Sequence, residues 1–170
     1  SENKKHVFFG GAFFGDQAIL CAKLNPKTNF YAFEPNLNQL KCLRLNKKIN
    51  KVGNLKIFNK ALFSKSNVKF NLKPSILSQK KPDAGEVKVF KYNTKRKKFI
   101  KSISIDDYCK SKKINFIDLI HVDVEGSENE IIKGSLEMLK NNRVENIIFE
   151  MNSNYVSWTK GLKRTKMIQL

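Results

Sequence analysis

The chain of 170 residues is poor in arginine and in acidic residues. Four arginines stand beside 29 lysines, and 33 Lys and Arg outnumber 15 Asp and Glu, which gives a formal net charge of +18. Arginine makes the bidentate contacts to phosphate and guanine, so its scarcity weighs against a dedicated nucleic-acid reader. Lysine and the 19 asparagines have A/T-rich codons, and codon bias is the simpler source of this composition. The surface should still attract anions.

Long apolar runs and paired cysteines are also missing. No stretch approaches the ~20 apolar residues of a spanning helix, and Val7–Phe9 is too short for a signal peptide. The cysteines Cys21, Cys42 and Cys109 are odd in number and lack metal-ligand spacing, so we predict no metal site. Cys21 and Cys42 fall on the apolar faces of predicted helices, so we expect them to be small hydrophobic residues of the core. We therefore expect a cytoplasmic protein with no membrane span and reduced thiols.

What is present indicates one folded α/β domain over residues 1–170. The hydrophobic fraction is 41 % and includes thirteen phenylalanines, which excludes a disordered chain. Short apolar runs alternate with helical stripes, and Asn36 can cap the second helix. The predicted order is strand Val7–Phe9, helix Asp16–Leu24, strand Asn29–Phe33, a helix to about Ile49, and strand Leu55–Phe58. Strands that are apolar throughout favour a parallel sheet covered on both faces.

The middle of the chain has a different pattern. Apolar and polar residues alternate over Asn67–Leu72, Glu86–Tyr92 and Phe99–Ile105, with a polar loop over Lys73–Gly85. Such alternation is typical of antiparallel strands that expose one face to solvent, so we predict inserted hairpins over about 62–105.

Strand and helix then alternate again. The predicted elements are a helix from Asp106 or Asp107 to Lys113, a strand Phe116–Val124, a helix Ser127–Lys140 and a strand Val144–Phe149.

The predicted strand ends carry the chemistry, because ligands of such sheets bind beyond the carboxyl ends of the strands. Gly10–Gly15 forms a glycine turn before a helix, and Glu34 ends the second strand. An acid at that place can accept hydrogen bonds from ribose hydroxyls, so we predict a nucleoside-containing cofactor. The G-x-G-x-x-G pattern of pyrophosphate turns is not met, because residue 12 is alanine.

The fourth predicted core strand ends in a second cluster of polar residues. Alternation puts His121, Asp123 and Glu125 on one side if the strand continues that far. Carboxylates are costly to bury without partners, so they should face a polar ligand, a cation or a proton to be removed. Ser127 and Glu130 have the spacing of a helix capping box, and we favour that structural role for both.

Three blocks of this sequence resemble the FkbM family of S-adenosylmethionine-dependent methyltransferases. They are Gly11–Gly15; Tyr31–Asn36 with Leu40 and Asn46; and Ser104–Asp107 together with Asp118–Glu128, Gly134 and Glu150. The resemblance covers about residues 7–150. It implies a Rossmann-like class I methyltransferase sheet, mostly parallel, with inserted antiparallel hairpins and a C-terminus that is shortened about twenty residues after the last strand.

The resemblance also implies a cofactor site. Gly11 and Gly15 would cradle the methionine part of S-adenosylmethionine, Glu34 would hold the ribose, and Asn59–Ala61 would lie near the adenine. The full predicted cofactor set is Gly10, Gly11, Ala12, Gly15, Glu34, Pro35, Asn36, Lys60, Ala61 and Asp123. The chain departs from the family pattern at Phe9 and Phe13, which replace polar residues, and at His121, which replaces a lysine.

The predicted activity is O-methylation of a hydroxyl on a sugar, glycan or small metabolite. Asp123, Glu125 and His121, in that order, are the candidate catalytic bases. One alternative is a binding protein that kept the fold without the reaction, which Phe9 and Phe13 motivate. Another is a nucleic-acid-binding or RNA methyltransferase module, motivated by the charge, although no Asn-Pro-Pro-Tyr-like motif follows the fourth core strand.

Overall fold

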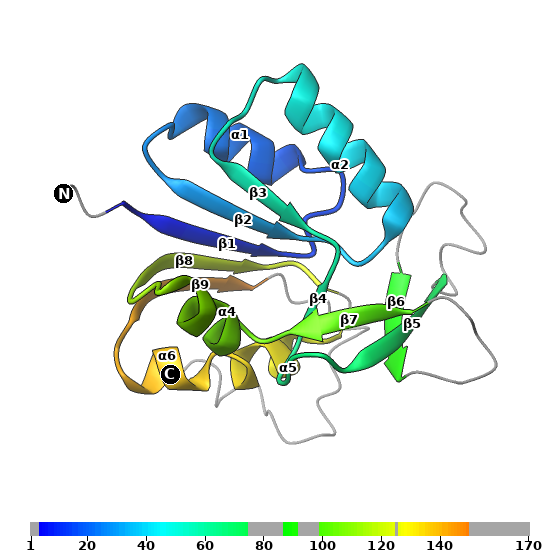
Figure 1. Cartoon of the computed structure of the whole chain (residues 1–170), viewed down its shortest axis with the longest axis vertical. Helices are drawn as coiled ribbons and strands as arrows, with labels where there is room; N and C mark the ends of the chain where they lie inside the picture. The colour runs from blue at the N-terminus through cyan, green and yellow to red at the C-terminus, as the bar shows by residue number, and fades with distance from the viewer. Residues whose placement is uncertain (1–3, 75–86, 92–98, 125, 150–170) are drawn as a thin grey trace.

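The computed structural model describes residues 4–74, 87–91, 99–124 and 126–149 (Figure 1). A five-stranded sheet, with strand order β3-β2-β1-β8-β9 and every pair parallel, forms its centre. Its strands are β1 (His6–Gly10), β2 (Asn29–Phe33), β3 (Leu55–Phe58), β8 (Ile117–Val122) and β9 (Val144–Phe149). The helices are α1 (Asp16–Leu24), α2 (Leu37–Ile49), α4 (Ile105–Lys112), α5 (Glu128–Lys133) and α6 (Leu136–Lys140). The predicted α/β fold with a mostly parallel sheet is confirmed.

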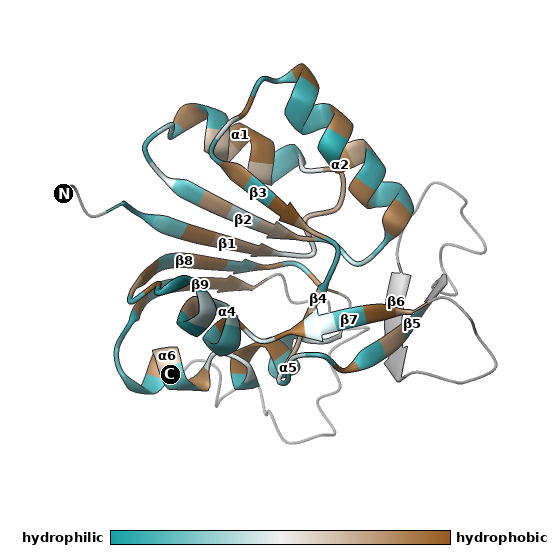
Figure 2. Cartoon of the chain, in the orientation of Figure 1, coloured by the Kyte–Doolittle hydropathy of each residue, from teal (hydrophilic) through white to brown (hydrophobic). Residues whose placement is uncertain are grey.

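The strands of the central sheet are rich in hydrophobic residues (Figure 2), and their side chains pack against helices on both faces. On one face Phe9 and Leu55 pack against α1 and α2, where Leu43 is fully buried. On the other face Phe8 packs with Tyr108 of α4, in a cluster that includes residues of α5 and α6. Burying strands on both faces is what the continuous apolar runs predicted.

A smaller sheet follows β3 along the chain. Its order is β4 (Ala61–Leu62), β7 (Ile100–Ile103), β5 (Lys69–Pro74) and β6 (Val87–Lys91). The β5–β6 and β5–β7 pairs are antiparallel, as predicted, whereas β4 and β7 are parallel. The short strand β4 was not predicted, because two residues show no periodicity. The assignment of residues 1–170 to one domain with an insertion stays a prediction.

The helix predicted over Ser127–Lys140 is wrong, because it divides into α5 and α6 at Gly134. The Gly134 carbonyl accepts a hydrogen bond from the Asp106 N–H at 2.9 Å instead of continuing a helix. The Asp106 carboxylate accepts from the N–H groups of Glu137 and Met138, at 2.9 and 3.0 Å. Because the Asp106 carboxylate satisfies the first N–H groups of α6, that helix can begin separately and does not continue α5.

Four smaller predictions also need correction. Ser104 caps α4 through the Asp107 N–H, whereas Asp106 and Asp107 lie in its first turn. The strand β8 ends at Val122, two residues earlier than predicted. The strand β9 lies at the sheet edge, where Ile148 is 51 % exposed, so it is not a buried core strand. Cys42 is exposed and is not a core residue.

Candidate cofactor and active site

The carboxyl ends of three strands meet at the middle of the sheet. Gly10 of β1 pairs with Phe33 of β2 on one side and with Val122 of β8 on the other. Beyond the strands, the N–H groups of Gly11 and Ala12 both donate to the Phe33 carbonyl, at 3.0 and 3.2 Å. The chain passes from β1 to β2 in one direction, while β8 lies on the opposite side of β1. This edge is therefore the topological switch point at which such sheets bind ligands.

Close backbone approaches explain two glycines of the turn after β1. Gly11 has φ +78°, and a Cβ there would lie 1.9 Å from the Asp123 carbonyl oxygen. Gly15 has φ +86°, and its Cβ would lie 2.2 Å from Cδ1 of Leu43 in α2. At Gly11 both the positive φ and the main-chain oxygen exclude a side chain, whereas at Gly15 the positive φ favours glycine and an added Cβ would displace the Leu43 side chain. The turn is thus held against the segment after β8 and against α2.

Glu34 is a buried carboxylate directly after β2. Its side chain is 3 % exposed; Oε2 accepts from the Phe13 N–H at 2.9 Å, and Oε1 accepts from the Asn36 N–H at 2.7 Å. Burial raises the pKa of Glu34 from 4.5 to about 7, and the two hydrogen bonds oppose that rise. A carboxylate offers about four acceptor positions, so both oxygens can accept further hydrogen bonds.

Asparagines fix the loops around Glu34. Asn36 caps α2 by accepting from the Asn38 N–H at 2.9 Å, which confirms the predicted cap. The Asn59 amide, directly after β3, donates to the carbonyls of Glu34 and Pro35 at 3.0 and 2.9 Å. This bridging role was not predicted, although a polar residue at a strand end was a signal for it.

The predicted adenine-side residues differ in their surroundings. Ala61 begins β4 and is buried in a cluster with Phe70 and Ile100 of the smaller sheet. Lys60, one residue earlier, is half-buried. Ala61 therefore helps to hold the smaller sheet together, and its assignment to the cofactor stays a prediction.

The candidate bases lie at the end of β8. His121 is half-buried and contacts the Phe9 ring, with 5.3 Å between ring centroids. Asp123 is half-buried and follows the strand directly, and its N–H donates to the Gly10 carbonyl at 3.0 Å. Glu125 lies outside the described residues. Phe9 itself is 4 % exposed and belongs to the core, so this departure from the family pattern has a packing role.

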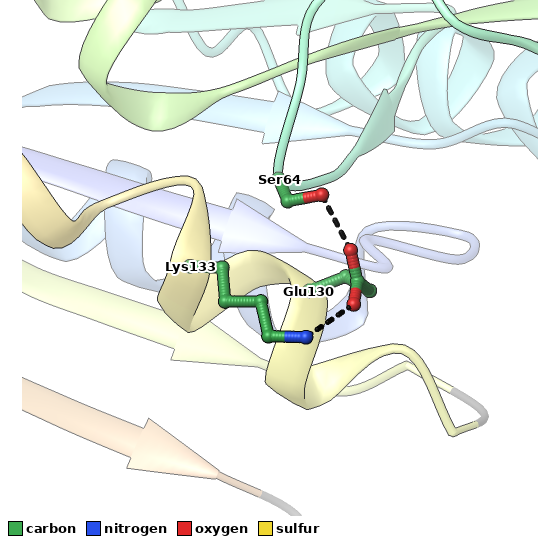
Figure 3. Close-up of polar contacts among 3 residues, drawn as sticks. All are labelled: Ser64, Glu130 and Lys133. Carbon is green, nitrogen blue, oxygen red and sulfur yellow. Dashed lines mark hydrogen bonds and ion pairs between the residues drawn. The ribbon is translucent and has the colours of Figure 1, made fainter. Parts of the chain in front are cut away.

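The predicted capping box of Ser127 and Glu130 is wrong. The Ser127 side chain makes no capping hydrogen bond. Glu130 instead accepts from the Ser64 hydroxyl and from Lys133 Nζ, the latter at 2.9 Å (Figure 3). Ser64 follows β4, so Glu130 connects the loop after β4 to α5, the helix that follows the candidate bases.

Several residues of the family-like signature have structural partners instead of a place at this edge. Asp106 holds the start of α6, as described above, and burial raises its pKa. The Asp107 carboxylate accepts a hydrogen bond from the Ser66 hydroxyl, and the Ser66 and Ser104 side chains hold the pKa of Asp107 below its usual range. The backbone at Gly134 leaves no room for a side chain, since a Cβ would lie 2.2 Å from the Phe63 carbonyl oxygen. These motif residues maintain the fold around the site.

The part of the chain that the structure describes offers little to other types of site. There, no group of three or more His, Cys, Asp or Glu could hold a metal ion, and no helix is long and apolar enough to cross a membrane. A cavity of about 410 Å³ between α4 and α6 is lined by Asp106, Lys110, Lys113 and Arg143 among others, and by none of the predicted site residues.

The parallel sheet, the glycine turn after β1 and the buried acid after β2 define a Rossmann-like domain of the kind that binds nucleoside cofactors. The family comparison makes this specific: the model of the methyltransferase FkbM domain matches residues 10–160. The chain therefore belongs to the FkbM methyltransferase domain family.

One solved structure shares the fold. Precorrin-6y C5,15-methyltransferase from Geobacter metallireducens GS-15 superimposes with a TM-score of 0.52 at 16 % identity, over 99 % of this chain and 62 % of that one. A human methyltransferase 10 domain containing protein gives a TM-score of 0.42 at 11 % identity, over 83 % of this chain and 47 % of that one. A search of curated proteins found no match. The chain thus spans about three-fifths of the first structure, and that likeness shows the fold alone.

Proposed function

We propose that the protein is an S-adenosylmethionine-dependent methyltransferase that acts on a hydroxyl group of a sugar, glycan or small metabolite. The observation that carries the proposal is the buried Glu34 carboxylate beside the glycine turn, at the switch point of a sheet in this family. An acid there can accept both ribose hydroxyls.

The residues at this edge fit such a cofactor. Each Glu34 oxygen has accepted one backbone N–H and can accept one hydroxyl more. The turn of Gly10, Gly11, Ala12 and Gly15 has no bulky side chain at these four positions and would take the methionine part. Pro35, Asn36, Lys60 and Ala61 would flank the nucleoside. When bound, the cofactor supplies an electrophilic methyl group on a sulfonium.

The chain's own residues would position the acceptor and remove its proton. As the acceptor oxygen bonds to the methyl carbon, the bond from that carbon to sulfur breaks and the hydroxyl proton passes to a base. Asp123 is the first candidate for the base because it stands directly beyond the Gly10–Val122 strand ends. His121 and Glu125 are the other candidates.

Calorimetric titration with S-adenosylmethionine tests cofactor binding. We expect Glu34→Gln to weaken binding about tenfold or more, because one ionic acceptor of the ribose hydroxyls is lost. Glu145→Gln, at an exposed position of β9, is the matched control and should bind like the wild type. No binding of millimolar cofactor by the wild type would overturn the proposal.

Methyl transfer from labelled cofactor to a panel of carbohydrate and small-molecule hydroxyls tests the reaction. At saturating cofactor, Asp123→Asn should lose about 10²–10⁴-fold in rate, the usual contribution of a general base. Cofactor binding without transfer to any hydroxyl would favour the non-catalytic alternative, and transfer to RNA would favour the nucleic-acid one.

A further inference from the structure

The outer surface of α1 and α2 carries apolar side chains that no part of the described structure covers. Leu20 and Leu24 of α1 are 57 % and 70 % exposed, and Leu45 and Ile49 of α2 are 56 % and 66 % exposed. We call these four residues the outer apolar face. Each pair is four residues apart and so lies on one side of its helix. Figure 2 shows both hydrophobic and hydrophilic residues on each of the two helices.

Net positive charge is concentrated in the same part of the chain, because acidic residues are missing there. Residues 17–82 contain 14 Lys and Arg and a single acid, Glu34, which is buried. The rest of the chain contains 19 Lys and Arg and 14 acids. Codon bias can raise lysine along the whole chain, but it does not explain why acids are missing from one segment. The charge is therefore segregated as well as large.

The cations and the apolar side chains occupy adjacent rows of α2. Arg44 and Lys48 are exposed, and each directly precedes a member of the outer apolar face, Leu45 or Ile49. Because both pairs repeat every four residues, a basic row runs beside an apolar row along the helix. Lys23 similarly precedes Leu24 at the end of α1 and is exposed.

We propose that the outer apolar face docks on the surface of a bilayer that contains anionic lipids. Such an interface accepts leucine side chains at the acyl boundary and attracts Lys and Arg to the headgroups. A second copy of this chain would bring two strongly positive surfaces together. A nucleic acid would use the cations but would leave the four apolar side chains in water.

The contact is peripheral and lies away from the candidate active site. The inner faces of both helices are used in the core, through Ile19 of α1 and Leu43 of α2, so neither helix can leave the sheet to insert. Both helices begin at the loops that carry Gly15 and Asn36, whereas the outer apolar face runs from the middle of α1 and the second half of α2 to their C-terminal ends. Docking therefore needs none of the proposed cofactor or catalytic residues and does not rest on methyl transfer.

Co-sedimentation with vesicles tests the proposal. The probes are vesicles of phosphatidylcholine and phosphatidylglycerol in equal parts, and vesicles of phosphatidylcholine alone. We expect binding to the anionic vesicles only. The double variant Leu45→Gln with Ile49→Gln should lower the partition coefficient by a factor of about ten or more. A similar loss is expected for Arg44→Gln with Lys48→Gln, and binding should weaken as salt is raised.

Leu136→Gln is the matched control, because Leu136 is an exposed apolar residue of α6, in the helical layer on the other face of the sheet. It should leave vesicle binding unchanged. Leu20→Gln with Leu24→Gln provides an independent pair if the α2 variant is misfolded by circular dichroism.

Three results would overturn the proposal. The first is no binding to anionic vesicles. The second is vesicle binding that is unchanged in the variants without the apolar pairs, together with an affinity for RNA equal to that for anionic vesicles. That result would assign the face to nucleic acid. The third is a dimer in sedimentation velocity that the Leu45→Gln and Ile49→Gln changes disperse, which would assign it to a second copy.

Discussion

Glu34 should make both stability and ligand binding depend on pH near neutrality. Its carboxyl group is buried, and its pKa is raised from 4.5 to about 7. A raised pKa means that the folded state holds the proton more tightly than the unfolded chain does. The stabilising effect is therefore fully present below pH 4.5 and is lost as the pH rises through about 7.

The size of the effect follows from the shift in pKa. At about 1.4 kcal/mol for each tenfold change, moving the pKa from 4.5 to about 7 costs the ionised form about 3 kcal/mol. Glu34→Gln removes the titration, so the wild type should lose about 3 kcal/mol of unfolding free energy relative to this variant between about pH 4.5 and pH 8. Urea unfolding of both proteins across that range measures the difference. A constant difference at all pH values would refute the argument.

Ligand binding should have the opposite pH dependence. The ionised carboxylate accepts two ribose hydroxyls, whereas the neutral acid must use one oxygen as a donor. With a pKa of about 7, the ionised fraction rises from about one tenth at pH 6 to about nine tenths at pH 8, so affinity should rise about ninefold.

Adenosine is the appropriate ligand for this measurement, since it carries the ribose and no group that titrates between those pH values. Its affinity for Glu34→Gln should not change with pH. An affinity for the wild type that is independent of pH would show that the ribose does not meet this carboxylate.

Three further predictions follow from local geometry. Gly11→Ala should destabilise the fold by about 2–4 kcal/mol and abolish cofactor binding, because a Cβ there meets a main-chain oxygen beyond β8. Gly53→Ala is the control: no atom of the described part of the chain lies within 4 Å of the added Cβ, so its stability in urea unfolding should stay within about 0.5 kcal/mol of the wild type. Tyr108→Phe should stabilise the fold by about 1 kcal/mol in the same assay, because the Tyr108 hydroxyl is buried with no hydrogen-bond partner among the described residues. A loss of stability would reveal a partner. Iodoacetamide should label the exposed Cys42 in the native protein and leave Cys109 unmodified, since Cys109 is buried and its pKa is raised to about 12; mass spectrometry of peptides reads this out, and rapid labelling of Cys109 would contradict the packing of α4.

Local patterns were sufficient for much of the fold. The bounds of β2, β3 and α1 are those predicted, because their apolar periodicity is strong and polar turns limit them. Asn36 was predicted as a cap from its position alone, since capping uses atoms two residues away. The edge at which Gly11, Glu34 and Asp123 gather followed from the parallel order of the strands.

The errors arose where distant residues replaced a local partner. Ser127 and Glu130 have the spacing of a capping box. The Glu130 carboxylate instead accepts a hydrogen bond from the hydroxyl of Ser64, which lies 66 residues from Glu130 in the chain. Gly134 looked like a position inside one helix. Instead, the Asp106 N–H donates to the Gly134 carbonyl, and the Asp106 carboxylate accepts from the N–H groups of the next turn. A periodic pattern cannot show such competition, because the competing group lies elsewhere in the chain.

The order of strands and helices, the glycine turn and the place of an acid after β2 are properties of the chain itself, because each depends on neighbouring residues and on strand direction. The pKa of Glu34, the exclusion of any side chain at Gly11 and the exposure of the apolar row on α2 belong to the tertiary structure. They depend on which atoms from other elements come within a few ångströms, and on which helix faces the sheet leaves uncovered.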